Sequence, residues 1–133
     1  MDYVTQLYEL AKQSREHAYA PYSGFKVGAA ILSQSNRTYG GCNVENISYP
    51  CGTCAEAGAI AAMVAGGDTQ IAAILIVADT ADIVPCGNCL QKIAEFGNVD
   101  TLIYSADLSG NIRTCKLADL LPHNFNAKEV KHA

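Results

Sequence analysis

Four of the six cysteines in this 133-residue chain form two pairs in which two residues separate the members. The first pair is Cys51 and Cys54, and the second is Cys86 and Cys89. Where thiols stay reduced, a repeated spacing of this kind indicates a metal site, above all for zinc, rather than disulfide bonds. Either pair alone could have a thioredoxin-like redox function, but two separated pairs at matching helix starts fit such a function poorly. We therefore expect zinc binding.

Glu56 follows Cys54 by two residues, in a stretch of otherwise small and apolar residues. A closed site of four cysteines would be structural and would have no use for this carboxylate. A site of three cysteines would leave one position for water, and a carboxylate beside the metal could take the proton of that water and pass it to a leaving group. A glutamate in the first turn of a helix is also favourable in its own right, so position alone leaves both interpretations open.

Each cysteine pair is predicted to stand where a loop becomes a helix. The alanine-rich stretch from Cys54 to Gly66 has helical composition and ends at a glycine typical of a helix C-terminus. The stretch 86–97 has a short apolar face and also ends at a glycine. Unpaired backbone N–H groups and the positive end of the helix dipole stabilise thiolates at such positions. The two other cysteines, Cys42 and Cys115, are expected to be small core residues.

The remaining elements alternate in type along the chain. The pattern predicts an amphipathic helix over 2–18, a hairpin of strands 25–33 and 37–44, a buried strand over 71–79, and strands over 100–107 and 111–117, followed by an irregular end from Leu120. Alternation of this kind predicts a single α/β domain over residues 1–133, in which a mixed central β-sheet lies between helices in three layers, α/β/α.

Composition narrows the range of partners. Half of the residues are hydrophobic and 17% are charged, as in a folded globular protein. No apolar run approaches the ~20 residues of a membrane helix, and the N-terminus shows no secretory signal, so we expect a cytoplasmic protein without membrane contact. A formal net charge of -4, with scattered basic residues, argues against nucleic acid binding and favours a small-molecule ligand.

The segment "CAE" at 54–56, followed by "PCGNC" at 85–89, is the cysteine form of a zinc deaminase signature. Together with "YAPYSGFKVGAA" at 19–30, "GCNVEN" at 41–46 and "LLPHNF" at 120–125, it resembles the cytidine deaminases of the small homotetrameric type over almost the full length of the chain. The resemblance implies a hydrolase of pyrimidine salvage that converts cytidine and deoxycytidine to uridine and deoxyuridine and releases ammonia.

The resemblance also implies the roles of individual residues. Cys54, Cys86 and Cys89 would hold one zinc ion per subunit, with water as the fourth ligand and Cys51 outside the site. Glu56 would be the catalytic residue that moves protons between this water, N3 of the base and the departing amino group.

The substrate contacts that the family implies come from several segments. Asn43 and Glu45 would hold a ribose hydroxyl, Phe25 would line the base pocket, and the backbone N–H of Ala55 would hold the pyrimidine carbonyl. Phe125 would enter the site of a neighbouring subunit, so that a homotetramer completes its active sites across subunit interfaces. Without the family, Asn43 and Glu45 would be ordinary loop residues, and the two phenylalanines would be core residues.

Two positions depart from the pattern of many family members, which carry arginine where this chain has Ala57 and Leu90. Zinc with three thiolates has a net negative charge that such arginines offset. Here the helix N-termini would have to supply the compensation, at about 0.3 to 1 kcal/mol each. We expect zinc to bind, with an activity that depends on N–H to sulfur hydrogen bonds.

Two alternatives remain open. One is a binding or structural protein with a four-cysteine zinc site, in which Cys51 is a ligand and Glu56 is incidental. The other is an enzyme of the same superfamily that deaminates another aminated nucleoside or base. The "NVEN" segment favours a ribosyl group, and therefore a nucleoside.

Overall fold

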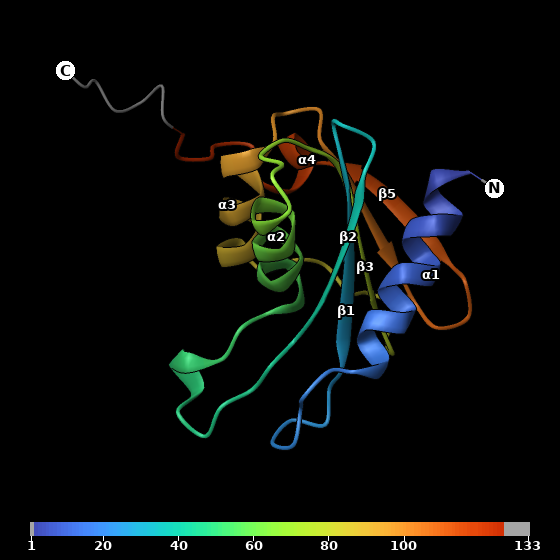
Figure 1. The fold of residues 1–133 in the computed structure, drawn as a ribbon, viewed down its shortest axis with the longest axis vertical. Helices are drawn as coiled ribbons and strands as arrows, with labels where there is room; N and C mark the ends of the chain where they lie inside the picture. The colour runs from blue at the N-terminus through green and yellow to red at the C-terminus, as the bar shows by residue number, and fades with distance from the viewer. Residues whose placement is uncertain (1, 127–133) are drawn as a thin grey trace.

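A five-stranded mixed sheet lies between two layers of helices (Figure 1). The structure is a computed structural model, and it describes residues 2–126. The strands follow the order β2-β1-β3-β4-β5, with α1 on one face and α2 and α3 on the other. The strands are β1 Val27–Ser33, β2 Thr38–Cys42, β3 Ile71–Ala78, β4 Leu102–Ala106 and β5 Ile112–Lys116. The three main helices are α1 Tyr3–Glu16, α2 Ala55–Ala65 and α3 Gly87–Phe96. The predicted three-layer α/β/α arrangement is confirmed.

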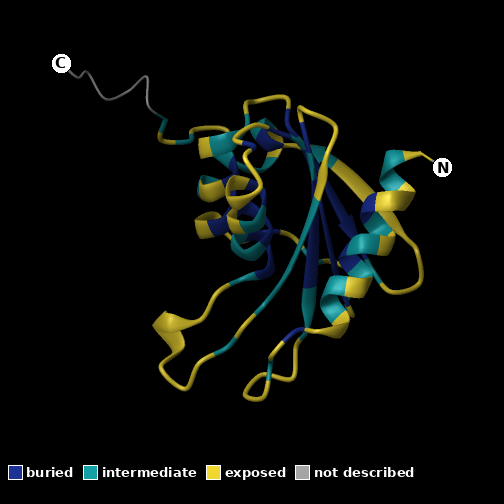
Figure 2. Cartoon of the chain, in the orientation of Figure 1, coloured by how far each residue is buried: buried dark blue, intermediate teal, exposed yellow. Residues whose placement is uncertain are grey.

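The central strand, β3, supplies side chains to both hydrophobic cores. Ile74 and Ile76 pack with α2 and α3, while Leu75 and Val77 pack with α1 on the opposite face. Since successive side chains of a strand point to opposite faces, a strand covered on both sides must be apolar throughout. Figure 2 shows this strand almost entirely buried, with the exposed residues on loops, on the outer faces of the helices and on the edge strand β5.

The helices pack directly on the backbone of the hairpin formed by β1 and β2. A Cβ atom built on Gly28 would lie 2.0 Å from the carbonyl oxygen of Ala11, and one on Gly41 would lie 2.3 Å from the backbone nitrogen of Ala59. These contacts leave no room for any side chain at either glycine. The close contact at Gly41 places the start of α2 against β2. This contact fixes the position of Cys54, at the start of α2, relative to the sheet.

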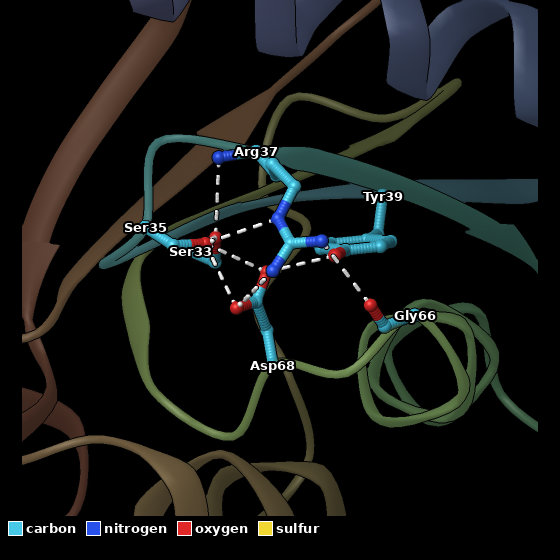
Figure 3. Close-up of polar contacts among 6 residues, drawn as sticks. All are labelled: Ser33, Ser35, Arg37, Tyr39, Gly66 and Asp68. Atoms are coloured by element: carbon cyan, nitrogen blue, oxygen red, sulfur yellow. Dashed lines mark hydrogen bonds and ion pairs between the residues drawn. The ribbon is translucent and has the colours of Figure 1, made fainter.

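A cluster of polar side chains ties the turn of this hairpin to the end of α2 (Figure 3). The buried carboxylate of Asp68 accepts hydrogen bonds from Tyr39 at 2.7 Å, from Ser35 at 2.8 Å and from Arg37 at 3.0 Å. Arg37 also donates to the carbonyl oxygen of Gly66 at 3.3 Å. The hydrogen bond from Tyr39, reinforced by that from Ser35, lowers the pKa of Asp68 to about 2.

The structure refines several predicted boundaries. The first helix ends at Glu16, and Asp2 is its N-cap, because the side chain of Asp2 accepts the N–H of Thr5 at 2.8 Å. Two short elements were not predicted, namely a 3-10 helix at Tyr49–Cys51 and α4 at Leu117–Leu120. Residues 121–126 have no regular structure, in agreement with the predicted irregular end. Within residues 2–126, none of the helices combines the length and apolarity that crossing a membrane requires.

Candidate functional site

The first part of the candidate site is the N-terminus of α2. Cys54 is the N-cap of this helix, and its Sγ accepts the backbone N–H of Ala57 at 3.4 Å. Glu56 lies in the first turn and is 6% exposed, and Ala55 is fully buried. The N-cap position gives Cys54 an extended backbone, which turns its side chain back toward the free N–H groups of the helix start.

The second part comes from α3, whose third residue is Cys89. This side chain is 2% exposed. The Sγ atoms of Cys54 and Cys89 and a carboxylate oxygen of Glu56 all lie within 4.8 Å of one another. Two thiols and a carboxylate are donors that suit zinc. The structure therefore brings together three of the four residues predicted at the metal centre, from two helices that lie on the same face of the sheet and that β3 separates in the sequence.

Burial and neighbouring charge set the acidities of these three groups. Burial, reinforced by the charge of Cys54, raises the pKa of Glu56 to about 7. A hydrogen bond from Cys89, the N–H of Ala57 and the positive charge of Lys92 together lower the pKa of Cys54 to about 6, against the effect of burial. The same hydrogen bond, together with burial, raises the pKa of Cys89. At neutral pH one thiol ionises readily, and the carboxyl group exchanges its proton.

Cys86 and Cys51 stand outside this group of three. Cys86 is the exposed N-cap of α3, and its side chain forms no capping hydrogen bond with the helix. Cys51 is also exposed, and its Sγ donates to the Oγ of Ser48 at 3.6 Å. In the described part of the chain, one member of each pair reaches the cluster, and a cage of four cysteines is not formed.

Asn43 is held against the segment that precedes β1. Its Oδ1 accepts the N–H of Val27 at 2.9 Å, and its Nδ2 donates to the carbonyl oxygen of Phe25 at 2.9 Å. Phe25 itself is 41% exposed, so its ring is not a core residue. Asn43 therefore fixes the backbone on both sides of Lys26, next to one of the predicted substrate residues.

Glu45 closes the turn before Phe25. Its Oε1 accepts the N–H groups of Tyr22 at 3.0 Å and Ser23 at 3.1 Å, and its Oε2 accepts the hydroxyl of Ser23. The bonds from Ser23 lower the pKa of Glu45. Tyr22, Ser23 and Glu45 line a cavity of about 390 Å³ together with Asn43. This cavity reaches Thr53, which directly precedes Cys54 of the metal centre.

Phe125 lies elsewhere, on the outer surface of α2 and α3. It is 65% exposed and lines a cavity of about 570 Å³ with Ala57, Gln91 and Lys92. Phe125 and Asn43 thus line different cavities of one chain.

Sequence reasoning missed Gln91 and Lys92. Lys92 could have been found, because residues three apart on a helix share a face and Lys92 follows Cys89 by three. No local signal indicates the contact of Gln91.

An α/β/α fold that groups thiols and a buried carboxylate at helix starts defines the class of zinc-dependent hydrolases. A family model described as the cytidine and deoxycytidylate deaminase zinc-binding region matches residues 1–106, and the chain belongs to this family. The matched region contains Cys54, Glu56 and Cys89, whose donor atoms suit the ion.

Curated relatives and solved structures agree with this assignment. The chain is 41% identical over 131 residues to a cytidine deaminase of Sporosarcina psychrophila, which covers 98% of this chain and 96% of that protein. It is 37% identical over 121 residues to a cytidine deaminase of Mycobacterium tuberculosis, covering 90% and 87% of the two chains. A crystal structure of cytidine deaminase from Burkholderia pseudomallei has a TM-score of 0.88 and 41% identity, and the match covers 94% of this chain and 100% of that one.

Proposed function

We propose that this protein removes the amino group of cytidine and deoxycytidine by hydrolysis, which gives uridine, deoxyuridine and ammonia. In this reaction the C4–N bond of the base breaks, a C4–O bond forms, and water supplies the oxygen and the protons. The observation that carries the proposal is the group formed by Cys54, Glu56 and Cys89, in which a buried carboxyl group stands beside two metal-binding thiols.

Cys54, Cys86 and Cys89 are the proposed ligands of one zinc ion per subunit. Cys54 ionises readily, and the N-termini of α2 and α3 favour negative charge on sulfur. The side chain of Cys86 can turn toward the other two because it has no capping hydrogen bond to break. The chemistry that zinc supplies when bound is Lewis acidity, which makes water a nucleophile near neutral pH.

Glu56 is the proposed catalytic residue. A group that both takes and gives protons works best when its pKa is near the working pH, and burial raises the pKa of Glu56 to about 7. In the proposed reaction Glu56 takes a proton from the attacking water and delivers it to N3 of the base. It then carries a second proton to the amino nitrogen, which leaves as ammonia.

The free hydrogen-bonding capacity of Asn43 and Glu45 matches one sugar hydroxyl. Asn43 uses its carbonyl oxygen on Val27 and one of its two N–H groups on Phe25, which leaves one donor. Oε2 of Glu45 accepts one bond and can accept another. A hydroxyl group is both acceptor and donor, so one hydroxyl satisfies both residues. Cytidine and deoxycytidine each offer such a group.

The base would be held by Ala55, Phe25 and Phe125. The N–H of Ala55 is at the start of α2, where backbone donors have no partner within the helix, and it would bind the pyrimidine carbonyl. Phe25 would line the base pocket of its own subunit. Phe125, which is 65% exposed, would enter the site of a neighbour.

We further propose that the protein is a homotetramer whose sites are completed across subunit interfaces. Exposed aromatic residues at both cavities support an interface there, because large apolar groups in contact with water favour association. The formal net charge of -4 supports a free nucleoside over a nucleic acid substrate. We also propose a cytoplasmic role in pyrimidine salvage, which is consistent with such a substrate.

The proposal is tested with purified, zinc-loaded protein and three substrates: cytidine, deoxycytidine and deoxycytidine monophosphate. We expect ammonia release from both nucleosides, with kcat reduced by about 100-fold or more in Glu56→Gln. The Gln variant keeps the size of the side chain and loses its ability to move protons. The proposal would be contradicted if neither nucleoside were turned over, or if deoxycytidine monophosphate were the only substrate turned over.

A further inference from the structure

The segment after α4 passes beside α3 (Figure 1). The side chain of Gln91 on α3 binds it through hydrogen bonds. Nε2 of Gln91 donates to the carbonyl oxygen of Phe125 at 2.5 Å, and the N–H of Phe125 donates to Oε1 of Gln91 at 3.3 Å. Both polar atoms of one side-chain amide therefore bind the backbone of one residue that lies 34 positions away.

This double contact fixes the backbone of Phe125 more firmly than a single hydrogen bond would. An amide that is paired at both its donor and its acceptor cannot rotate without breaking both bonds. Phe125 as a residue is 65% exposed, so packing within its own chain contributes little to the position of its side chain. The position of Phe125 thus depends on Gln91.

The contact shares a cavity with a residue that binds the metal centre. Gln91 and Phe125 line the same cavity as Ala57, whose N–H binds the Sγ of Cys54. Gln91 belongs to α3, the helix that also carries Cys89. The helix that supplies a proposed ligand to one site therefore also holds the aromatic residue proposed for a neighbouring site.

We propose that Gln91 is a positioning residue, which holds Phe125 in the place from which it completes the base pocket of an adjacent subunit. The inference rests on the proposed function of Phe125 and adds the residue through which the chain controls it. Gln91 itself would not touch the substrate.

Gln91→Met tests this role, because methionine has a similar shape and forms neither hydrogen bond. We expect the KM for cytidine to rise about three- to tenfold, with kcat nearly unchanged, since the loss falls on substrate binding. Gln13→Met, the same substitution at an exposed position of α1 on the other face of the sheet, is the control and should leave KM unchanged.

The same change in a Phe125→Ala background separates positioning from a general structural effect. If Gln91 acts through Phe125, the double variant should have the KM of Phe125→Ala alone. An equal rise in KM in both backgrounds would overturn the proposal, as would an unchanged KM in Gln91→Met. A zinc content lower in Gln91→Met than in Gln13→Met would also overturn it, by showing that Gln91 acts through the metal centre.

Hydrogen exchange tests the contact without any measurement of activity. The amide proton of Phe125 should exchange several-fold faster in Gln91→Met than in Gln13→Met, because it has lost its acceptor. Unchanged exchange would overturn the proposal. If the protein turns over no cytidine while Gln91→Met speeds this exchange, the proposed function fails and the Gln91–Phe125 contact stands.

Discussion

The Sγ of Cys54 accepts a hydrogen bond of 3.4 Å from the backbone N–H of Ala57, three residues further along α2. Because the donor is a backbone group, the bond does not depend on the side chain at position 57. Lys92, on the neighbouring helix, adds a positive charge that acts on both Cys54 and Glu56. Lys92 therefore supplies part of the charge compensation that arginines at positions 57 and 90 would otherwise provide, while the Ala57 N–H binds the sulfur whatever side chain position 57 carries.

The first prediction concerns the acidity of Cys54 in protein stripped of metal with a chelator. The hydrogen bond from Cys89, with the Ala57 N–H and Lys92, lowers the pKa of Cys54 to about 6. Its alkylation by iodoacetamide, followed by mass spectrometry, should therefore reach half its maximal rate near pH 6. In Lys92→Met the midpoint should move upward, because removal of a cation disfavours the thiolate. A midpoint near the ordinary thiol value of 9.0 would contradict this prediction.

The second prediction contrasts two ways of restoring an arginine. Ala57 lines an open cavity, whereas Leu90 is 6% exposed and belongs to the core between the sheet and α2. Ala57→Arg should change the free energy of unfolding by less than about 1 kcal/mol and should slow zinc loss to a chelator roughly two- to fivefold at low salt. Leu90→Arg should lower that free energy by about 2 to 5 kcal/mol, because it places a charge in the core.

Urea unfolding of the two variants measures the difference in stability. The rate at which zinc is released to a coloured chelator measures zinc retention. Equal stability of Ala57→Arg and Leu90→Arg would contradict the assigned packing. Faster zinc loss from Ala57→Arg than from the parent protein would show that the centre does not need more positive charge.

The local signals in the sequence located the ends of α2 and α3 and the buried strand, but not the positions of all the side chains at the site. The glycines after α2 and α3 and the apolar run of β3 are short-range patterns, and the structure confirms each of them. The exposed position of Cys86 is different, because the spacing of a cysteine pair does not determine which side-chain rotamer each cysteine adopts.

Contacts between distant residues could not be predicted, for a related reason. The bonds of Gln91 to Phe125, and those of Asp68 to Tyr39, join residues about thirty positions apart. Such pairs form only after the helices and strands have packed, and no periodicity of the chain records them. The family resemblance assigned a role to Phe125 but gave no reason for its position.

The third prediction distinguishes the two exposed cysteines, Cys51 and Cys86. Cys51→Ala should keep one zinc ion per chain, since Cys51 is exposed and contacts Ser48 rather than the centre. Cys86→Ala should lower zinc affinity on the order of 100-fold, because it removes a proposed thiolate ligand. Metal analysis after dialysis against a graded zinc buffer measures both. Zinc loss from Cys51→Ala as well as from Cys86→Ala would support the four-cysteine site instead, whereas retention by Cys86→Ala would show that Cys86 is not a ligand.

The fourth prediction uses two glycines at the contact between β2 and α2. A Cβ at Gly41 would lie 2.3 Å from the backbone nitrogen of Ala59, whereas one at Gly58 would find its nearest neighbour at 3.4 Å, the carbonyl oxygen of Cys42. Gly41→Ala should therefore destabilise the fold by about 1 to 3 kcal/mol. Gly58→Ala should stabilise it by roughly 0.5 to 1 kcal/mol, because alanine replaces glycine within a helix. Urea unfolding of both variants should show opposite signs, and a common sign would contradict the packing.

The fifth prediction is the pH dependence of the contribution of Asp68 to stability. The hydrogen bond from Tyr39, with that from Ser35, lowers the pKa of Asp68 in the folded protein from 3.8 to about 2 (Figure 3). A carboxyl group with a lowered folded-state pKa stabilises the fold above its unfolded pKa, and this contribution is lost as the pH falls through the folded value. The parent protein should thus be more stable than Asp68→Asn at pH 5, and the difference should shrink between pH 4 and pH 2. Tyr39→Phe removes the main donor, so it should raise the pKa of Asp68 and move this loss to higher pH. Urea unfolding at each pH measures the difference, and a constant difference from pH 5 to pH 2 would show that the charge of Asp68 does not stabilise the link between the hairpin turn and α2.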